Sequence, residues 1–223
     1  MATPTFNKII SFMRKSNYQI YDSPYKLNIV GVRNAESKPN KFDDNVFVFY
    51  KNDKNDWIVK NYNATTDTGT YWLLNPMNPK GAAMMKEGQY VNAYQKGYHR
   101  GQPALVQVKP IVVYRDYDRN AIFDFGTLEQ TGLFGINIHR AGENSQNVDK
   151  WSAGCQVFQK SADFEEFMEL AEKHRNLFGN EFTYTLIDER ALARKGRRIL
   201  LYSGIALSVM VGIGFTIYKI MKR

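Results

Sequence analysis

Residues 135–158 read GINIHRAGENSQNVDKWSAGCQVF, and this stretch combines strand-like patterning with the most informative polar residues of the chain. An alternating apolar run ends at His139, a polar loop follows, and a turn of small residues leads to Cys155 and a second apolar run. A strand, a loop and a further apolar run in this order are typical of a β-rich domain. Cys155 is the only cysteine of the chain, which argues against a disulfide framework or a cysteine-rich zinc site.

Similar strand-like runs lie on both sides of this stretch, separated by clusters of Asn, Asp, Gly and Pro. They are residues 25–32, 46–50, 57–60, 70–74, 104–108, 111–114, 135–139 and 182–187. Helical periodicity marks a helix with Ser161 as its expected N-cap and Gly179 as its stop. A short amphipathic helix near the N-terminus is expected to pack on the body. The predicted fold class is mainly β (α+β), with one packed helix.

The positive charge of the chain is concentrated at its C-terminal end. The 223 residues include 30 Lys and Arg against 22 Asp and Glu. Residues 191–223 hold seven of the basic residues and none of the acidic ones, so the rest of the chain is nearly neutral. A nucleic-acid-binding protein would carry its basic surface on the folded domain, and we therefore expect no nucleic-acid partner.

An uncharged run of twenty residues, ILLYSGIALSVMVGIGFTIY, extends from Ile199 to Tyr218. As a helix it would span roughly 30 Å, the thickness of a bilayer's hydrocarbon core, and basic residues flank both of its ends. The run therefore predicts a transmembrane helix that binds a lipid membrane. The expected organisation is a body at 1–190, a basic linker at 191–198, a transmembrane helix at 199–218 and a basic tail at 219–223.

Two further features concern this membrane anchor. Gly204, Ser208 and Gly212 are spaced by four residues, so they would share one helix face and allow self-association. The N-terminal residues have only short apolar pieces, interrupted by Lys8 and Arg14, and do not resemble a secretory signal. The sequence thus predicts a single-pass membrane protein with a C-terminal anchor.

Cys155 and His139 are candidates for a nucleophile and its general base. A thiol nucleophile needs a base within hydrogen-bond reach and donors for the developing oxyanion. The candidate donors are the N–H of Cys155 and that of Gly154 or Ala153. The competing interpretation is an inert buried cysteine near a surface histidine.

A catalytic imidazole also needs a group that orients it, and the sequence leaves this group open. The alternatives are Ser152, Asn137 and a backbone carbonyl near Arg140 and Ala141. His99, between Gly97 and Gly101, is the next titratable candidate for the cleft, and a surface histidine in a tight turn is the simpler interpretation. His174, beside the apolar stripe of the predicted helix, is expected to be structural.

A histidine, a polar loop and then Ser-x-Gly-Cys resemble the signature of the L,D-transpeptidase catalytic (YkuD-like) family. The whole run is also similar to stretches in phage-encoded proteins of that class. Residues 64–71 (ATTDTGTY) loosely resemble the family's upstream strand motif, without its proline. The resemblance implies a β-rich fold that acts on the stem peptides of peptidoglycan through a Cys–His pair.

By position, the resemblance makes Cys155 the nucleophile and His139 the base, and it places Ser152 and Gly154 in the motif. Two positions depart from the family. Ala153 stands where most members have a second histidine, and Gln156 stands where many have Arg or Asn. These departures fit a hydrolytic relative better than a strict transpeptidase.

The resemblance implies a membrane-anchored cysteine peptidase that forms an acyl-enzyme on peptidoglycan stem peptides, with no metal or organic cofactor. The expected substrate contacts are Arg140, Trp151, Gln156 and His99. A C-terminal anchor would leave the body in the cytoplasm, so the internal membrane of a virion is the expected location for such a phage lytic enzyme. The alternative is a non-catalytic structural or adsorption protein of a membrane-containing virion.

Residues 116–124 (DYDRNAIFD) place oxygen-bearing side chains at the first, third, fifth and ninth positions of a loop. These residues are Asp116, Asp118, Asn120 and Asp124. The spacing matches the first part of a calcium loop, but Ala121 replaces the glycine at the sixth position and the twelfth is not Glu. An acidic turn between strands is the favoured interpretation, and a Ca²⁺ site is the alternative.

Overall fold

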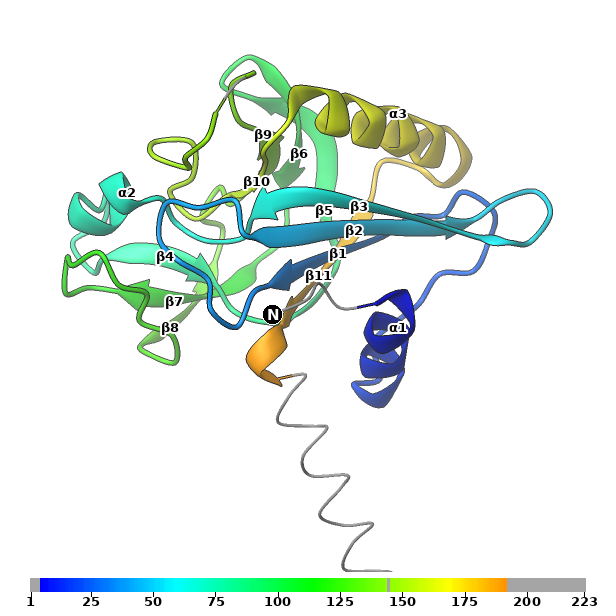
Figure 1. Cartoon of the computed structure of the whole chain (residues 1–223). Helices are drawn as coiled ribbons and strands as arrows, with labels where there is room; N and C mark the ends of the chain where they lie inside the picture. Colours follow the sequence, from blue (N-terminus) through cyan, green and yellow to red (C-terminus); the bar gives the residue numbers. More distant parts are fainter. Residues whose placement is uncertain (1–4, 144, 192–223) are drawn as a thin grey trace, which may run out of the picture. The chain divides into compact units, whose positions relative to one another are not determined.

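The computed structural model describes residues 5–143 and 145–191, and the chain divides into two units, Met1–Asp188 and Glu189–Arg223. The first unit is built mainly from strands (Figure 1). Its elements are α1 (Phe6–Lys15), β1 (Asn28–Arg33), β2 (Asp44–Lys51), β3 (Trp57–Thr65), α2 (Thr70–Leu74), β4 (Ala82–Met85), β5 (Gly88–His99), β6 (Gln102–Gln107), β7 (Ile111–Asp116), β8 (Glu129–Gly132), β9 (Ile138–Arg140), β10 (Gln156–Phe158), α3 (Ser161–Phe178) and β11 (Phe182–Asp188).

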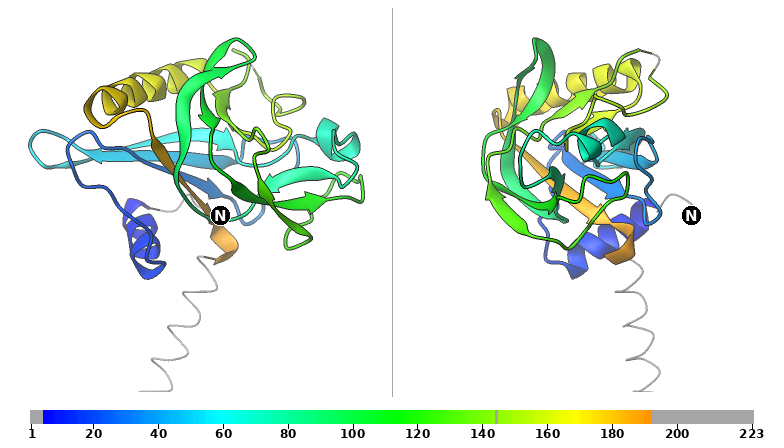
Figure 2. Two further views of the ribbon diagram at one scale, coloured as in Figure 1. Left: turned by 180° about the vertical axis from the view of Figure 1, so that it is seen from behind. Right: turned by 90° about the vertical axis from the view of Figure 1, so that its left-hand side faces the viewer.

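Eight of the strands form one mixed sheet that closes on itself in the order β1, β11, β5, β6, β9, β10, β3 and β2. The pairs β1–β11 and β9–β10 are parallel, and the other pairs are antiparallel. The strands β4, β7 and β8 form a second, smaller antiparallel sheet beside it (Figures 1 and 2). This architecture confirms the predicted mainly β (α+β) class with a packed helix.

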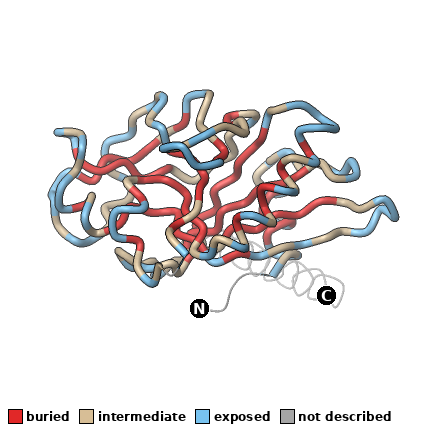
Figure 3. Tube along the Cα trace, turned by 90° about the horizontal axis from the view of Figure 1, so that it is seen from above, coloured by how far each residue is buried: buried red, intermediate tan, exposed pale blue. Residues whose placement is uncertain are grey.

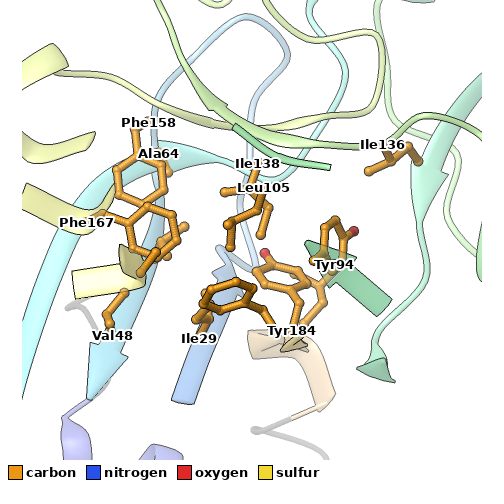
Figure 4. Packing of buried hydrophobic residues seen from close by; sticks show 14 of the residues in the cluster. Ile29, Val48, Ala64, Tyr94, Leu105, Ile136, Ile138, Phe158, Phe167 and Tyr184 are labelled. Atoms are coloured by element: carbon orange, nitrogen blue, oxygen red, sulfur yellow. The ribbon is translucent and has the colours of Figure 1, made fainter. Parts of the chain in front are cut away.

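The core lies inside the closed sheet, where the side chains of facing strands meet (Figure 4). Phe158 from β10 stacks on Phe167 from α3 at 5.1 Å between ring centroids and meets Phe164 edge-on at 5.3 Å. Burial follows the strands, while the loops between them are exposed (Figure 3). The helix α3 thus buries its apolar stripe, as its periodicity predicts.

The N-terminal helix α1 packs on the body, as the sequence predicts. It buries Ile9 and Met13, and the ring of Phe6 lies 5.2 Å from that of Phe49. In the views of Figures 1 and 2, α1 and α3 lie on opposite sides of the closed sheet. His174 on α3 is buried, and its Nδ1 accepts the N–H of Leu27 at 3.0 Å, which confirms its structural role.

Two local predictions are wrong. Residues 70–74 were expected as a strand, but they form the short helix α2, in which Leu73 is the buried residue. A five-residue apolar run cannot be assigned by periodicity alone, and here no neighbouring strand pairs with it. The N-cap of α3 is Lys160 rather than Ser161, whose hydroxyl instead accepts a hydrogen bond from Arg140 at 3.0 Å.

The predicted transmembrane run, residues 199–218, lies outside the described residues, as do Gly204, Ser208 and Gly212. Within residues 5–143 and 145–191, none of the helices combines the length and the apolar character needed to cross a bilayer.

A buried ionic cluster joins β1 to the loop after β3. Arg33 is fully buried, and its Nε lies 2.7 Å from Oδ1 of Asp67, which is also buried. The guanidinium also donates to the carbonyls of Thr66 at 3.2 Å and Met85 at 3.0 Å. Asp44, a second buried carboxylate, accepts the N–H of Thr66 at 2.7 Å. These groups lie in the protein interior, where a charge that loses its partner strongly lowers the stability of the fold.

The close approach of β1 to β11 yields a stability prediction. A Cβ on Gly31 would lie 1.8 Å from the hydroxyl oxygen of Tyr184, so Gly31→Ala should destabilise the fold by about 1–3 kcal/mol through overpacking. The matched control is Gly88→Ala, because a Cβ on Gly88 meets its nearest atoms at 3.7 Å, an ordinary contact. Urea unfolding of the full-length variants measures both effects. Equal unfolding midpoints for the two variants would contradict the prediction.

Candidate functional site

The parallel pairing of β9 with β10 brings His139 and Cys155 together. Val157 lies beside His139 in the ladder, and Gln156 lies beside Ile138. Successive side chains of a strand point to opposite faces, so His139 and Val157 share one face while Ile138 shares the other with Gln156. Ile138 belongs to the core inside the closed sheet (Figure 4). Cys155, two residues before Val157, packs with it in a separate small cluster.

The same alternation removes Gln156 from the expected substrate contacts. Its side chain is fully buried, and its Oε1 accepts the hydroxyl of Tyr184 at 2.7 Å. Its amide nitrogen lies 3.3 Å from the carbonyl oxygen of Gly154. Gln156 therefore supports the site from the interior, and the expectation that it contacts substrate is wrong.

The turn before Cys155 is held by the two other motif residues. The hydroxyl of Ser152 donates to the carbonyl of Cys155 at 2.8 Å and accepts the N–H of Gly154 at 3.1 Å. Gly154 has a φ of 122°, and a Cβ there would lie 2.3 Å from the carbonyl oxygen of Ala83. Ser152 thus shapes the turn and does not orient His139. Because the N–H of Gly154 is engaged by Ser152, the N–H groups of Cys155 and Ala153 are left as the candidate oxyanion donors.

Cys155 is largely enclosed, with 8% of its surface exposed. Its sulfur accepts the backbone N–H of Asn137 at 3.4 Å and donates towards the carbonyl of Gly135 at 3.6 Å. Burial raises the pKa of the Cys155 thiol to about 11, and the Asn137 hydrogen bond opposes this shift. The resting thiol is therefore protonated at neutral pH.

His139 is oriented by a backbone carbonyl, one of the three alternatives left open by the sequence. Its Nδ1 lies 2.9 Å from the carbonyl oxygen of Arg140. A carbonyl can only accept, so Nδ1 carries the proton and Nε2 keeps a free lone pair. Nε2 is buried and has no hydrogen-bond partner among the described residues. Burial lowers the pKa of His139 to about 4, and the charges of His99 and Arg100 add to this effect.

His99, at the end of β5, completes the site. Its ring stacks on that of His139 at 4.8 Å between centroids and 26° between planes. Its Nδ1 lies 2.9 Å from Nδ2 of Asn137, whose Oδ1 accepts the N–H of Gln107. Asn137 therefore donates to Nδ1, and a neutral His99 carries its proton on Nε2. The structure thus places His99 against His139 at the end of a strand, whereas the simpler interpretation of the sequence was a surface histidine in a tight turn.

Cys155, His139 and His99 each offer a ligand atom, and these atoms lie within 4.8 Å of one another. Such a set can hold a transition metal when each imidazole presents an unprotonated nitrogen. His99 does not fit this requirement, because Asn137 occupies Nδ1 and Nε2 bears the proton. The hydrogen bonds favour a thiol–imidazole site over a metal centre.

Two cavities meet at this cluster. One, of about 350 Å³, is lined by Cys155, and the other, of about 340 Å³, is lined by His139. The walls that both cavities share are His99, Arg100, Lys150 and Trp151. Trp151 is 44% exposed, so this shared wall of the two cavities is open to solvent. Two of the predicted substrate contacts, His99 and Trp151, therefore lie between the two cavities.

The lining of the cavities is positively charged. Arg100 and Lys150 face both of them, Arg115 lines the first and Arg140 lines the second. None of the lining residues is Asp or Glu. Arg100 and Lys150 were not singled out by the sequence, since lone basic residues in loops carry no pattern. Such a lining favours ligands that bear carboxylates or other anionic groups.

The remaining predicted site residues belong to the end of β7 and the loop that follows it, and none of them lines either cavity. Asp116 ends β7, and Asp118, Asn120 and Asp124 follow in the loop that leads to β8. The structure brings the three carboxylates of this loop together.

The chain matches no known protein family, no curated protein and no solved structure. The resemblance to the L,D-transpeptidase family therefore depends on the motif residues of 135–158 and on the site that they form.

Proposed function

We propose that this protein is a membrane-anchored cysteine peptidase, L,D-transpeptidase-like, that cleaves peptide bonds in peptidoglycan stems. The observation that carries the proposal is the free lone pair of His139 Nε2, which is buried beside the thiol of Cys155 and has no hydrogen-bond partner among the described residues. A histidine in this tautomer is ready to accept a proton. Residues 199–218 would anchor the enzyme in a membrane, and the internal membrane of a phage particle is the proposed location.

The reaction begins from a neutral thiol and a neutral imidazole. When a substrate amide enters the first cavity, the Cys155 thiol turns from Gly135 towards His139 and transfers its proton to Nε2. The sulfur attacks the carbonyl carbon, and the N–H groups of Cys155 and Ala153 stabilise the oxyanion. His139 then gives the proton to the leaving amine, and a thioester remains.

Hydrolysis of the thioester completes the cycle. His139 Nε2 takes a proton from water as the water oxygen attacks the thioester carbonyl. Collapse of the second tetrahedral intermediate releases a carboxylic acid, and the proton returns to the sulfur. An amine that replaced this water would produce transpeptidation, and the second cavity, lined by His139, offers a place for either nucleophile.

The charge of the cavities supports a carboxylate-bearing substrate. Arg100 and Lys150 line both cavities, and no acidic side chain opposes them there. Stem peptides of peptidoglycan carry free carboxylates, which cationic walls would attract and orient. A neutral or cationic peptide would gain nothing from this lining.

One observation favours a second candidate function, that of a non-catalytic structural or adsorption protein of a membrane-containing virion. Cys155 is largely buried, and its pKa is raised rather than lowered. Thiolate nucleophiles are usually exposed groups with lowered pKa. In this alternative Cys155 and His139 are a packed pair, and the cavities have no catalytic role.

Digestion of purified peptidoglycan sacculi separates the two functions. The full-length protein is incubated with sacculi, and the released muropeptides are identified by mass spectrometry. New peptide fragments would support the peptidase, and altered cross-links without release would point to transpeptidation. Unchanged sacculi, together with a Cys155 that does not react with a thiol probe in the folded protein, would favour the structural protein.

The dependence of the rate on pH tests the neutral resting pair. With a His139 pKa of about 4, the base is deprotonated and competent above that pH and is lost only as the pH falls through it. With a Cys155 pKa of about 11, the thiol keeps its proton throughout the neutral range. We expect kcat/KM on a stem-peptide substrate to stay nearly constant from about pH 5 to about pH 9. A bell-shaped profile centred near neutrality would contradict this expectation.

A further inference from the structure

The loop between β7 and β8 gathers three carboxylates that the proposed peptidase reaction does not use. Oxygen atoms of Asp116, Asp118 and Asp124 lie within 4.8 Å of one another. Asn120, from the same loop, hydrogen-bonds the Asp118 carboxylate through its side-chain amide. Such a cluster on a solvated loop would be unremarkable by itself, since exposed acidic groups often gather without a ligand.

Asp116 distinguishes this loop from a solvated acidic turn. Its side chain is 0% exposed, and its Oδ1 is buried without a hydrogen-bond donor among the described residues. Its other oxygen, Oδ2, accepts the N–H of Asp124 at 3.0 Å. A buried carboxylate oxygen that none of the described groups satisfies is costly, so this oxygen needs a partner from outside the described residues.

No basic side chain of the described residues supplies that partner. The adjacent Arg115 turns away, because its Nε donates to Gln130 at 2.8 Å and its guanidinium donates to the carbonyl of Gly81 at 3.1 Å. Within residues 5–143 and 145–191, no Lys or Arg forms an ion pair with any of the three carboxylates. A cation from solution would supply the partner that the described residues do not supply.

We propose that Asp116, Asp118 and Asp124 bind a divalent cation of the Ca²⁺ class. All three side chains present oxygen, the ligand that hard divalent cations prefer. Their positions, first, third and ninth in an irregular loop, suit the flexible coordination of Ca²⁺ better than the strict octahedron of Mg²⁺. Thr127 stands where calcium loops have a bidentate Glu, so we expect weak binding, with a Kd of about 10⁻⁴–10⁻³ M.

The proposed cation site lies against the wall of the Cys155 cavity. Asp116 pairs with Ala82 across the β4–β7 ladder, and Ala82 and Ala83 line that cavity. Gly81 packs so closely on the Asp116 carbonyl that a Cβ there would lie 1.8 Å from the oxygen. A cation on Asp116 would therefore stiffen the β4 wall, whatever reaction the cavity supports.

Terbium luminescence on the full-length protein tests the site directly. Tb³⁺ prefers the same oxygen ligands as Ca²⁺, and Tyr117, between two of the ligands, can sensitise its emission. We expect saturable emission that Ca²⁺ displaces, and binding at least about tenfold weaker in Asp118→Asn and Asp124→Asn. Asp22→Asn, on an exposed acid outside the loop, is the matched control and should bind as wild type does.

Thermal unfolding supplies a second readout that does not depend on luminescence. Millimolar Ca²⁺ should raise the Tm of the wild type and of Asp22→Asn, relative to EDTA, and should leave Asp118→Asn and Asp124→Asn unchanged. Unsaturable emission, or equal binding by all variants, would overturn the proposal. Displacement by Mg²⁺ as efficient as by Ca²⁺ would overturn the assignment to the Ca²⁺ class.

Discussion

Cys155→Ala should release peptide fragments from sacculi at least about a thousandfold more slowly than wild type, and His139→Ala should show a loss of the same size. The two losses should be similar, because removing either member of a nucleophile–base pair disables the same step. In the double variant the loss should not increase further, for the same reason. Release is measured as the initial rate of new muropeptide fragments from the full-length proteins.

The controls for this prediction separate chemistry from folding. Lys54→Ala changes an exposed side chain in the turn between β2 and β3 and should keep the wild-type rate. Cys155→Ala removes only a sulfur atom from a small cluster, so its thermal unfolding should stay close to that of wild type. Release by Cys155→Ala at the wild-type rate would exclude the thiol mechanism.

The largest effect on stability is expected for Arg33→Met. The substitution removes the cation and leaves Asp67 buried without its partner, with Asp44 buried nearby. Breaking a buried ion pair by removing one member costs about 3–5 kcal/mol, because the remaining charge has lost both its water and its partner. Urea unfolding, followed by circular dichroism on the full-length protein, measures this loss.

A surface ion pair provides the matched comparison. Lys60 and Glu166 lie 2.7 Å apart with both side chains partly exposed, so Lys60→Met should change stability by at most about 1 kcal/mol. Adding Asp67→Asn to Arg33→Met should recover part of the loss, because it removes the unpaired charge. If Arg33→Met fails to fold, the stability of this double variant can still be measured and compared with that of the wild type. Equal losses for Arg33→Met and Lys60→Met would show that burial does not matter here.

The residues around Cys155 indicate local structure, because the alternation of side chains along a strand can be read from neighbouring residues. Alternating apolar residues before His139 and a small-residue turn before Cys155 made the two residues candidates for a pair, and the structure places their ligand atoms within 4.8 Å of each other. The same alternation could have shown that Gln156 must face away from Cys155, since neighbours along a strand point to opposite sides. That inference needed the start of β10, which a three-residue strand does not reveal.

The short helix α2 is an element that the local sequence pattern did not predict. Residues 70–74 read as a strand, but no strand of the closed sheet is available to them, and the N–H of Gly69 donates to the carbonyl of Ser152 at 2.9 Å. That bond ties the start of α2 to the turn that carries Cys155. A contact between segments so far apart in the chain leaves no trace in the local periodicity.

His99 is the clearest residue whose role was decided by the tertiary structure. Its place beside His139 depends on the pairing of β5 with β6 and of β6 with β9. Its tautomer depends on Asn137, a residue 38 positions away. Nothing in the residues around His99 distinguishes it from a surface histidine in a turn.

The β-rich class and the packed helices α1 and α3 follow from short-range periodicity in the amino-acid sequence, whereas Cys155 and His139 were only candidates beside the alternative of an inert cysteine. The sequence left three features open that the folded sheet settles: the Arg140 carbonyl orients His139, Cys155 is a buried thiol, and Asp116 lies buried among the carboxylates of its loop. The physical reason is that burial, tautomer and pKa depend on atoms brought together by the closure of the sheet, and these atoms come from distant parts of the chain.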